Sequence, residues 1–265
     1  MPYFERPGFS FHYEVVEGAL PADTVFLHGN LASNLWWEPA REILRTKAEP
    51  RWKGRMILAE WRGFGGSAKF DGPLELPTLA EDVNALVQGL ELKAPRLVGH
   101  STGGVIALAA LASAPSLYER ALLLDSVTPE GVPFGPEALA AFAEMGRNRA
   151  TCAAILLSTI HGGNLSEAFR ERIVDAAFNA HPSVWQGVPE MLRPPLPRIS
   201  LEAIRCPVLV AHGEHDAVLT VAGARALAEA LPKGKLEVLP GRGHCPNVED
   251  PELFVRLALD FLYGS

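Results

Sequence analysis

Short, continuously apolar runs alternate along most of the chain with longer segments in which apolar residues recur at helical spacing. The apolar runs lie at residues 24–27, 56–59, 97–98, 121–124 and 207–211. Between the second and third runs, residues 78–92 carry Leu79, Val83, Leu86, Val87 and Leu90 on one side of a predicted helix. Strands that are apolar throughout are typical of a parallel sheet whose two faces are both covered by helices, so the pattern indicates the α/β class.

The alternation stops after Asp125 and resumes at residue 207. Residues between these points are helical and loop-like in pattern and are interrupted by prolines. An opening hairpin at 3–6 and 9–16 and a closing strand at 235–239 bring the expected number of strands to eight. We therefore predict a core domain from residues 1–126 and 205–265, with a helical lid, residues 127–204, inserted after the sixth strand.

Composition narrows the classes of partner. The chain has 265 residues, 48% of them hydrophobic, and a formal net charge of −7, which argues against nucleic acid or an anionic membrane as the partner. We see no secretory signal and no apolar stretch of membrane-spanning length. Cys152, Cys206 and Cys245 lack metal-ligand spacing and are expected to be reduced thiols of a cytoplasmic protein. We expect no cofactor and no metal.

The segment Gly99-His100-Ser101-Thr102-Gly103 fits the G-x-S-x-G pattern of a nucleophile elbow. It follows an apolar strand and precedes a predicted helix of small apolar residues, which is the context that this motif requires. A turn sharp enough to present Ser101 at the end of a strand leaves no space for Cβ atoms on its neighbours, so glycine fits on both sides. Ser101 is therefore the candidate nucleophile.

Taken together, the motifs of the chain resemble those of the α/β-hydrolase fold family over essentially the whole length outside the lid. The matching segments are His28-Gly29-Asn30, Arg62-Gly63-x-Gly65-x-Ser67, the Ser101 elbow, His212-Gly213-x-x-Asp216-x-Val218 and Gly243-His244. The resemblance implies a mostly parallel eight-stranded sheet with helices on both faces. It also implies a serine hydrolase whose triad follows the chain order Ser, Asp, His.

His244 is the expected general base, since it lies in a glycine-rich loop after the last predicted strand. Two aspartates compete for the acid that orients it. Most of the resembling family places this acid where Asp216 stands, whereas haloalkane dehalogenases place theirs where Asp125 stands. We favour Asp216 and keep Asp125 as the alternative. The backbone N–H groups of Asn30 and Thr102 are expected to form the oxyanion hole.

Haloalkane dehalogenases and epoxide hydrolases of this fold use aspartate as the nucleophile, and here that position is Ser101. The sequence therefore argues against both of these activities.

The family usually has aspartate where this chain has Glu60, which we interpret as a solvated or salt-bridged carboxylate. His12 is interpreted as a surface residue of a strand.

Apolar residues of the lid are expected to supply part of a substrate pocket that favours an apolar acyl or alcohol group. The candidates are Phe134, Phe142, Met145, Ile155, Leu156, Leu157, Ile160, Phe169, Phe178, Trp185 and Met191. One inward-facing lid arginine would instead favour a substrate with a carboxylate. The candidates for that role are Arg147, Arg149, Arg170, Arg172 and Arg193.

The sequence thus predicts a serine hydrolase that cleaves a small-molecule carboxylic ester or lactone through an acyl-enzyme. A carbon–carbon bond hydrolase or an acyltransferase could use the same triad. A ligand-binding protein without catalysis is a further alternative, but such a protein is expected to have lost a triad residue. We expect a monomer or a homodimer.

Overall fold

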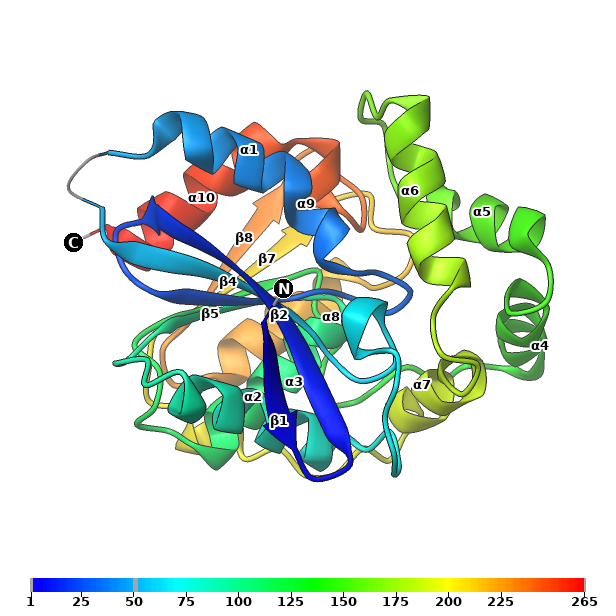
Figure 1. The fold of residues 1–265 in the computed structure, drawn as a ribbon, viewed down its shortest axis with the longest axis horizontal. Coiled ribbons are helices and arrows are strands. Elements are labelled where there is room, and N and C mark those ends of the chain that lie inside the picture. Colours follow the sequence, from blue (N-terminus) through cyan, green and yellow to red (C-terminus); the bar gives the residue numbers. More distant parts are fainter. Residues whose placement is uncertain (1, 50–51, 265) are drawn as a thin grey trace.

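A single eight-stranded sheet forms the centre of the protein (Figure 1), whose computed structural model describes residues 2–49 and 52–264. The strand order is β1-β2-β4-β3-β5-β6-β7-β8. β2 pairs antiparallel with both β1 and β4, and all other neighbours are parallel. The bounds are β1 Tyr3–Arg6, β2 Phe9–Leu20, β3 Thr24–Leu27, β4 Gly54–Glu60, β5 Arg96–His100, β6 Ala121–Leu124, β7 Val208–Gly213 and β8 Gly234–Leu239. The predicted fold class is confirmed.

Helices cover both faces of the sheet because successive side chains of a strand point to opposite faces. In β3, Val25 and Leu27 pack into one apolar cluster and Phe26 into the other. On the Phe26 side lie α1 (Glu38–Lys47) and α10 (Pro251–Tyr263), and on the opposite side lie α2, α3 and α8 (Figure 1). The bounds of these three are α2 Leu76–Gly89, α3 Thr102–Ser113 and α8 Val221–Ala230.

Four helices connect β6 to β7 and lie together at one side of the sheet (Figure 1). They are α4 Pro136–Met145, α5 Arg149–Ser158, α6 Glu167–Phe178 and α7 Val184–Leu192. The side chains of Asn148 and Ser166 cap α5 and α6, respectively, by accepting hydrogen bonds from first-turn N–H groups. We call residues 127–204 the insertion. Its role as a lid stays a prediction.

Some boundaries differ from those expected. β2 extends four residues beyond the predicted end, because a register shift between Val16 and Leu20 lets the strand resume pairing with β4. α2 begins at Leu76 rather than at residue 78, with Pro77 in its first turn, a position where a missing N–H costs nothing. The remaining short elements are η1 Asn34–Trp37, η2 Gly65–Ser67, η3 Leu201–Ala203 and α9 Pro246–Glu249. None of the helices in the described part of the chain is long and apolar enough to span a membrane.

Candidate active site

Ser101 lies at the turn between β5 and α3 in a strained backbone conformation, with φ 53° and ψ −118°. In this turn the backbone of β5 lies very close to the first residues of α3, and those residues lie very close to the end of β3. A Cβ added to Gly99 would lie 2.4 Å from the carbonyl oxygen of Gly103, and one added to Gly103 would lie 2.4 Å from that of Leu27. The glycines of the predicted elbow are therefore required by packing, and the strain points the Ser101 side chain away from the strand.

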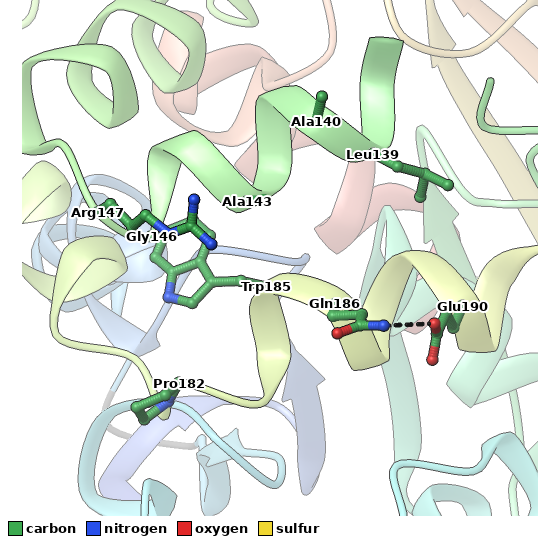
Figure 2. Close-up of a pocket in the computed structure, with 9 residues that line it drawn as sticks. All are labelled: Leu139, Ala140, Ala143, Gly146, Arg147, Pro182, Trp185, Gln186 and Glu190. Atoms are coloured by element: carbon green, nitrogen blue, oxygen red, sulfur yellow. Dashed lines mark hydrogen bonds between the residues drawn. The ribbon is translucent and has the colours of Figure 1, made fainter. Parts of the chain in front are cut away.

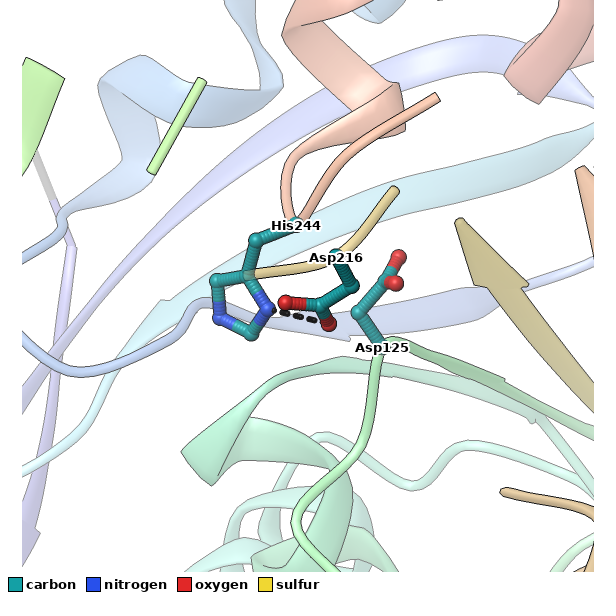
Figure 3. A group of neighbouring side chains, drawn as sticks. All are labelled: Asp125, Asp216 and His244. Atoms are coloured by element: carbon teal, nitrogen blue, oxygen red, sulfur yellow. Dashed lines mark hydrogen bonds and ion pairs between the residues drawn. The ribbon is translucent and has the colours of Figure 1, made fainter. Parts of the chain in front are cut away.

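His244 lies in the loop between β8 and α9, and its ring connects Ser101 to Asp216. The ring Nε2 is 2.9 Å from the Ser101 Oγ, and Nδ1 is 2.8 Å from Oδ2 of Asp216. Figure 3 shows the second of these hydrogen bonds, with Asp125 next to Asp216 on the side away from His244. Three residues far apart in the sequence thus form one continuous hydrogen-bonded chain.

Asp216 is fixed as an anion by its surroundings. Burial by itself raises the pKa of its carboxyl group, but the hydrogen bond from His244, the charge of that ring and two backbone N–H groups bring the pKa below its usual value. Those N–H groups belong to Val218 and Leu219 and donate to Oδ1 at 2.7 and 3.0 Å. A carboxylate so held is able to orient His244 and to stabilise an imidazolium.

Asp125 lies close to the same pair but in a different environment. Its side chain is fully buried, Oδ1 accepts a hydrogen bond from the Gly213 N–H at 2.8 Å, and Oδ2 has no hydrogen-bond partner among the described residues. Burial, together with the nearby negative charge of Asp216, raises the pKa of the Asp125 carboxyl well above its usual value. Burial therefore disfavours the anionic form of Asp125, and His244 Nδ1 forms its hydrogen bond with Asp216 instead.

Asp125, Asp216 and His244 each bring a possible ligand atom within 4.8 Å of the others. A shared cation would need His244 Nδ1 and Asp216 to give up their direct hydrogen bond, and the burial that raises the pKa of Asp125 opposes its use as an anionic ligand. The donor set therefore fits a triad with a buried neighbouring acid better than it fits a metal site.

Two further histidines support the site without facing the nucleophile. His100 Nε2 lies 2.8 Å from the carbonyl oxygen of His244, and because a carbonyl only accepts, this ring nitrogen carries the proton. Burial, and after it the nearby His244, lowers the pKa of His100 to about 3. Burial likewise lowers the pKa of His28 to about 4. Both rings are therefore neutral at pH 7 and support the site by packing and hydrogen bonding.

The low pKa values of His28 and His100 predict acid-sensitive stability. In the unfolded chain both rings titrate near their ordinary value of about 6.5. Below that pH the unfolded state binds protons that the folded state does not, so the free energy of unfolding should fall by up to about 1.4 kcal/mol per pH unit for each ring. Urea unfolding followed by tryptophan fluorescence at pH 7, 6 and 5 measures this slope. A constant free energy over this range would contradict the prediction, and His28→Asn should make the slope shallower.

Asn30 and Thr102 line the same cavity as Ser101 and His244. Thr102 is the first residue of α3, and the first N–H groups of a helix have no acceptor within the helix. Asn30 follows β3, and its side-chain oxygen accepts from the Leu31 N–H at 2.9 Å, with Leu31 in a left-handed conformation. The two residues predicted for the oxyanion hole therefore lie at the start of α3 and in the loop after β3, the strand that pairs with β5.

The cavity above Ser101 has a volume of about 200 Å³ and is mostly apolar. Five of the predicted residues line it, namely Phe134, Phe142, Met145, Ile155 and Leu156, and the insertion adds Val127, Val132, Thr159 and Leu192. The other apolar candidates lie outside it. None of the five insertion arginines lines it, and two of them are engaged elsewhere, Arg149 with Glu171 and Asp175 and Arg172 with Glu38.

A larger cavity of about 530 Å³ opens between α4 and α7, and Arg147 lies there together with Trp185 (Figure 2). Gln186 and Glu190 of α7 hydrogen-bond to each other along its edge. No residue of the predicted triad lines this cavity. Volume alone therefore does not identify the reactive site, because Ser101 and His244 line the smaller cavity.

The interpretation of His12 is wrong, and of the two alternatives for Glu60 the structure favours the paired carboxylate over the solvated one. His12 is buried rather than at the surface, and its Nδ1 lies 2.7 Å from Oε2 of Glu60. Glu60 is buried as well and accepts hydrogen bonds from the N–H groups of Asn34 and Gly66. Glu60 thereby connects β4 to the segment that follows the predicted oxyanion loop. No periodicity could reveal this, because His12 lies 48 residues away in the sequence.

Comparison with known proteins places this geometry in a family. The model of the family described as "Alpha/beta hydrolase family" matches residues 24–257, which is most of the chain. The chain belongs to the alpha/beta hydrolase family. The esterase EaEST from Exiguobacterium antarcticum has the same fold, with a TM-score of 0.85 and 22% identity over 97% of this chain and 96% of that one.

Relatives in this family carry hydrolase names of three kinds. RutD of Caulobacter sp. (strain K31), named for carbamate hydrolysis, is 27% identical over 96% of each chain. The carboxylesterase YbfK of Bacillus subtilis (strain 168) is 27% identical over 91% of this chain and 80% of its own. The 3-oxoadipate enol-lactonase 2 of Acinetobacter baylyi (strain ATCC 33305 / BD413 / ADP1) is 28% identical over 75% of each. These alpha/beta hydrolases support hydrolase activity.

Proposed function

We propose that this alpha/beta hydrolase cleaves a carboxylic ester or lactone with Ser101 as nucleophile, His244 as general base and Asp216 as the orienting acid. The observation that carries the proposal is the hydrogen-bonded chain from Ser101 Oγ through His244 to Asp216, which opens into an apolar cavity. The carboxylesterase and enol-lactonase names of two relatives agree with it.

In this mechanism His244 Nε2 accepts the proton of the Ser101 hydroxyl as the oxygen attacks the substrate carbonyl carbon. The carbonyl oxygen becomes an oxyanion and is stabilised by the N–H groups of Asn30 and Thr102. His244 then protonates the leaving alkoxide, the carbon–oxygen bond breaks, and an acyl-enzyme remains. Water enters, gives its proton to the same nitrogen and releases the acid.

Asp216 acts as an anion throughout these reaction steps. It keeps the proton of His244 on Nδ1, so that Nε2 presents a lone pair to Ser101. When the ring takes up the second proton, the adjacent negative charge stabilises it. His244 Nδ1 bonds to Asp216 rather than to Asp125, and we assign Asp125 to the hydrogen bond with Gly213.

The wall of the cavity predicts the kind of ester. No lysine, arginine, aspartate or glutamate is among the described residues that line it. A substrate carboxylate would therefore be buried without a cation, which costs several kcal/mol. We expect p-nitrophenyl valerate to be hydrolysed with a kcat/KM on the order of 100-fold above that of p-nitrophenyl hydrogen succinate, an ester of similar length that ends in a carboxylate.

Steady-state kinetics with these two esters and a five-membered lactone test the proposal. Equal kcat/KM for the neutral and the charged ester would contradict the apolar cavity as the acyl site. Absence of turnover with any ester or lactone, together with cleavage of a β-diketone, would favour the carbon–carbon hydrolase. Oligomeric state and compartment stay predictions.

A further inference from the structure

Glu249 is a buried carboxylate, 6% exposed, that lies at the end of α9 and turns back toward the loop containing His244. Its Oε2 accepts a hydrogen bond from the Gly243 N–H at 2.6 Å, and its Oε1 accepts one from the Cys245 N–H at 3.0 Å. These two donors are the residues on either side of His244. No lysine or arginine in the described ranges forms an ion pair with Glu249, so backbone donors satisfy this carboxylate.

A third hydrogen bond reaches Glu249 from the insertion. The N–H of His161, in the connection between α5 and α6, donates to the same Oε1 at 2.9 Å. The two segments also pack directly on each other, because a Cβ added to Gly243 would lie 2.4 Å from the Cβ of His161. One carboxylate thus connects the histidine loop to a segment of the insertion that is 88 residues away from it in sequence.

The His244 backbone is held from its other side as well. Its carbonyl oxygen accepts a hydrogen bond from the His100 Nε2–H, with an N···O distance of 2.8 Å. With both neighbouring N–H groups bound to Glu249 and its own carbonyl bound to His100, the peptide units around His244 have little freedom. The position of the ring opposite Ser101 is therefore set by these bonds together with the one to Asp216.

We propose that Glu249 is a positioning residue, which fixes the His244 loop against Ser101 and ties the α5–α6 connection of the insertion to that loop. This inference rests on the proposed function, in which His244 is the base. Glu249 touches neither the nucleophile nor the cavity, so it acts through the loop. A displacement of a base by about 1 Å can cost about 100-fold in rate, which makes such support a kinetic requirement.

Glu249→Gln tests the proposal with little change in side-chain volume. The amide keeps one acceptor oxygen and places an NH₂ group, which cannot accept, against one of the backbone donors. We expect kcat for p-nitrophenyl valerate to fall by about 10- to 100-fold while KM changes by less than threefold, because the cavity itself is unaltered. The rate of Ser101 labelling by a fluorophosphonate should fall in parallel.

Two matched variants separate positioning from a general loss of stability. Asp23→Asn removes a charged partner of Arg55 at the opposite end of β3 and should lower stability without changing kcat of the folded enzyme. His161→Ala keeps the backbone N–H that Glu249 accepts and should keep kcat within about twofold. A folded Glu249→Gln enzyme with kcat within twofold of wild type would overturn the proposal. An inactive wild type would instead overturn the proposed function.

Amide hydrogen exchange on the wild type tests the connection between Glu249 and the insertion without substrate. This measurement remains possible if Glu249→Gln fails to fold. The N–H groups of His161, Gly243 and Cys245 should exchange slowly and at similar rates, since all three bind one buried carboxylate. Rapid exchange at His161 beside slow exchange at Gly243 and Cys245 would refute the tie to the insertion.

Discussion

Ser101→Ala is expected to abolish ester turnover, with kcat reduced on the order of 10⁴- to 10⁶-fold. The substitution removes only the hydroxyl group, whose oxygen forms the bond to the acyl group in the proposed mechanism. Folding should be intact, because alanine meets the same backbone conformation as serine and loses one hydrogen bond, worth about 1 kcal/mol. Steady-state kinetics and thermal unfolding measure the two effects.

The matched control is Ser126→Ala, which removes a second buried hydroxyl, one that donates to the Val127 carbonyl rather than to His244. Its turnover should stay within about threefold of wild type. A fluorophosphonate should label the wild type and Ser126→Ala but not Ser101→Ala. Labelling of Ser101→Ala at the wild-type rate would place the nucleophile elsewhere.

Asp216→Asn and Asp125→Asn should have very different effects. Asp216→Asn is expected to lower turnover by about 10⁴-fold, because an amide neither holds His244 in the required tautomer nor stabilises the imidazolium. Asp125→Asn should stay within about tenfold of wild type, because His244 bonds to Asp216 and the asparagine oxygen can still accept from the Gly213 N–H. Turnover at pH 7.5 by both variants, with circular dichroism to verify folding, provides the comparison.

The opposite ranking would transfer the acid role to Asp125, the alternative that the sequence left open. Equally small losses of turnover in both variants would show that neither carboxylate is needed to orient His244, and would contradict the proposed mechanism. Asp125→Ala supplies a further check, since it removes the acceptor for Gly213 and should therefore lower stability more than asparagine does.

The sequence predicted the centre of the sheet well because strands β3 to β7 are buried on both faces and therefore stand out as apolar runs. The elbow was equally visible, since the close approach at Gly99 and Gly103 leaves only glycine at those positions. Motif order likewise suggested Ser101, Asp216 and His244, although only coordinates give the distances that join them.

The residues that support the site were not predictable in the same way. Glu60 and Glu249 are single carboxylates whose partners are mainly backbone N–H groups, and such donors carry no signature in side-chain sequence. A glutamate five residues after the candidate base could have been noted, but its fold back onto the loop follows from the short α9. Which apolar residues of the insertion face the cavity likewise depends on how its helices pack, which periodicity does not determine.

The place where the insertion joins the sheet has a consequence for how substrate preference can diversify. Its two ends leave from β6 and β7, adjacent parallel strands paired in register from Ala121–Val208 to Leu124–Ala211. Exchanging this whole segment for that of another alpha/beta hydrolase would leave the strand pairing and Ser101 in place while replacing much of the cavity wall. Substrate preference can thus change by replacement of this one segment between β6 and β7. The new segment would still have to donate a backbone N–H to Glu249, as His161 does here.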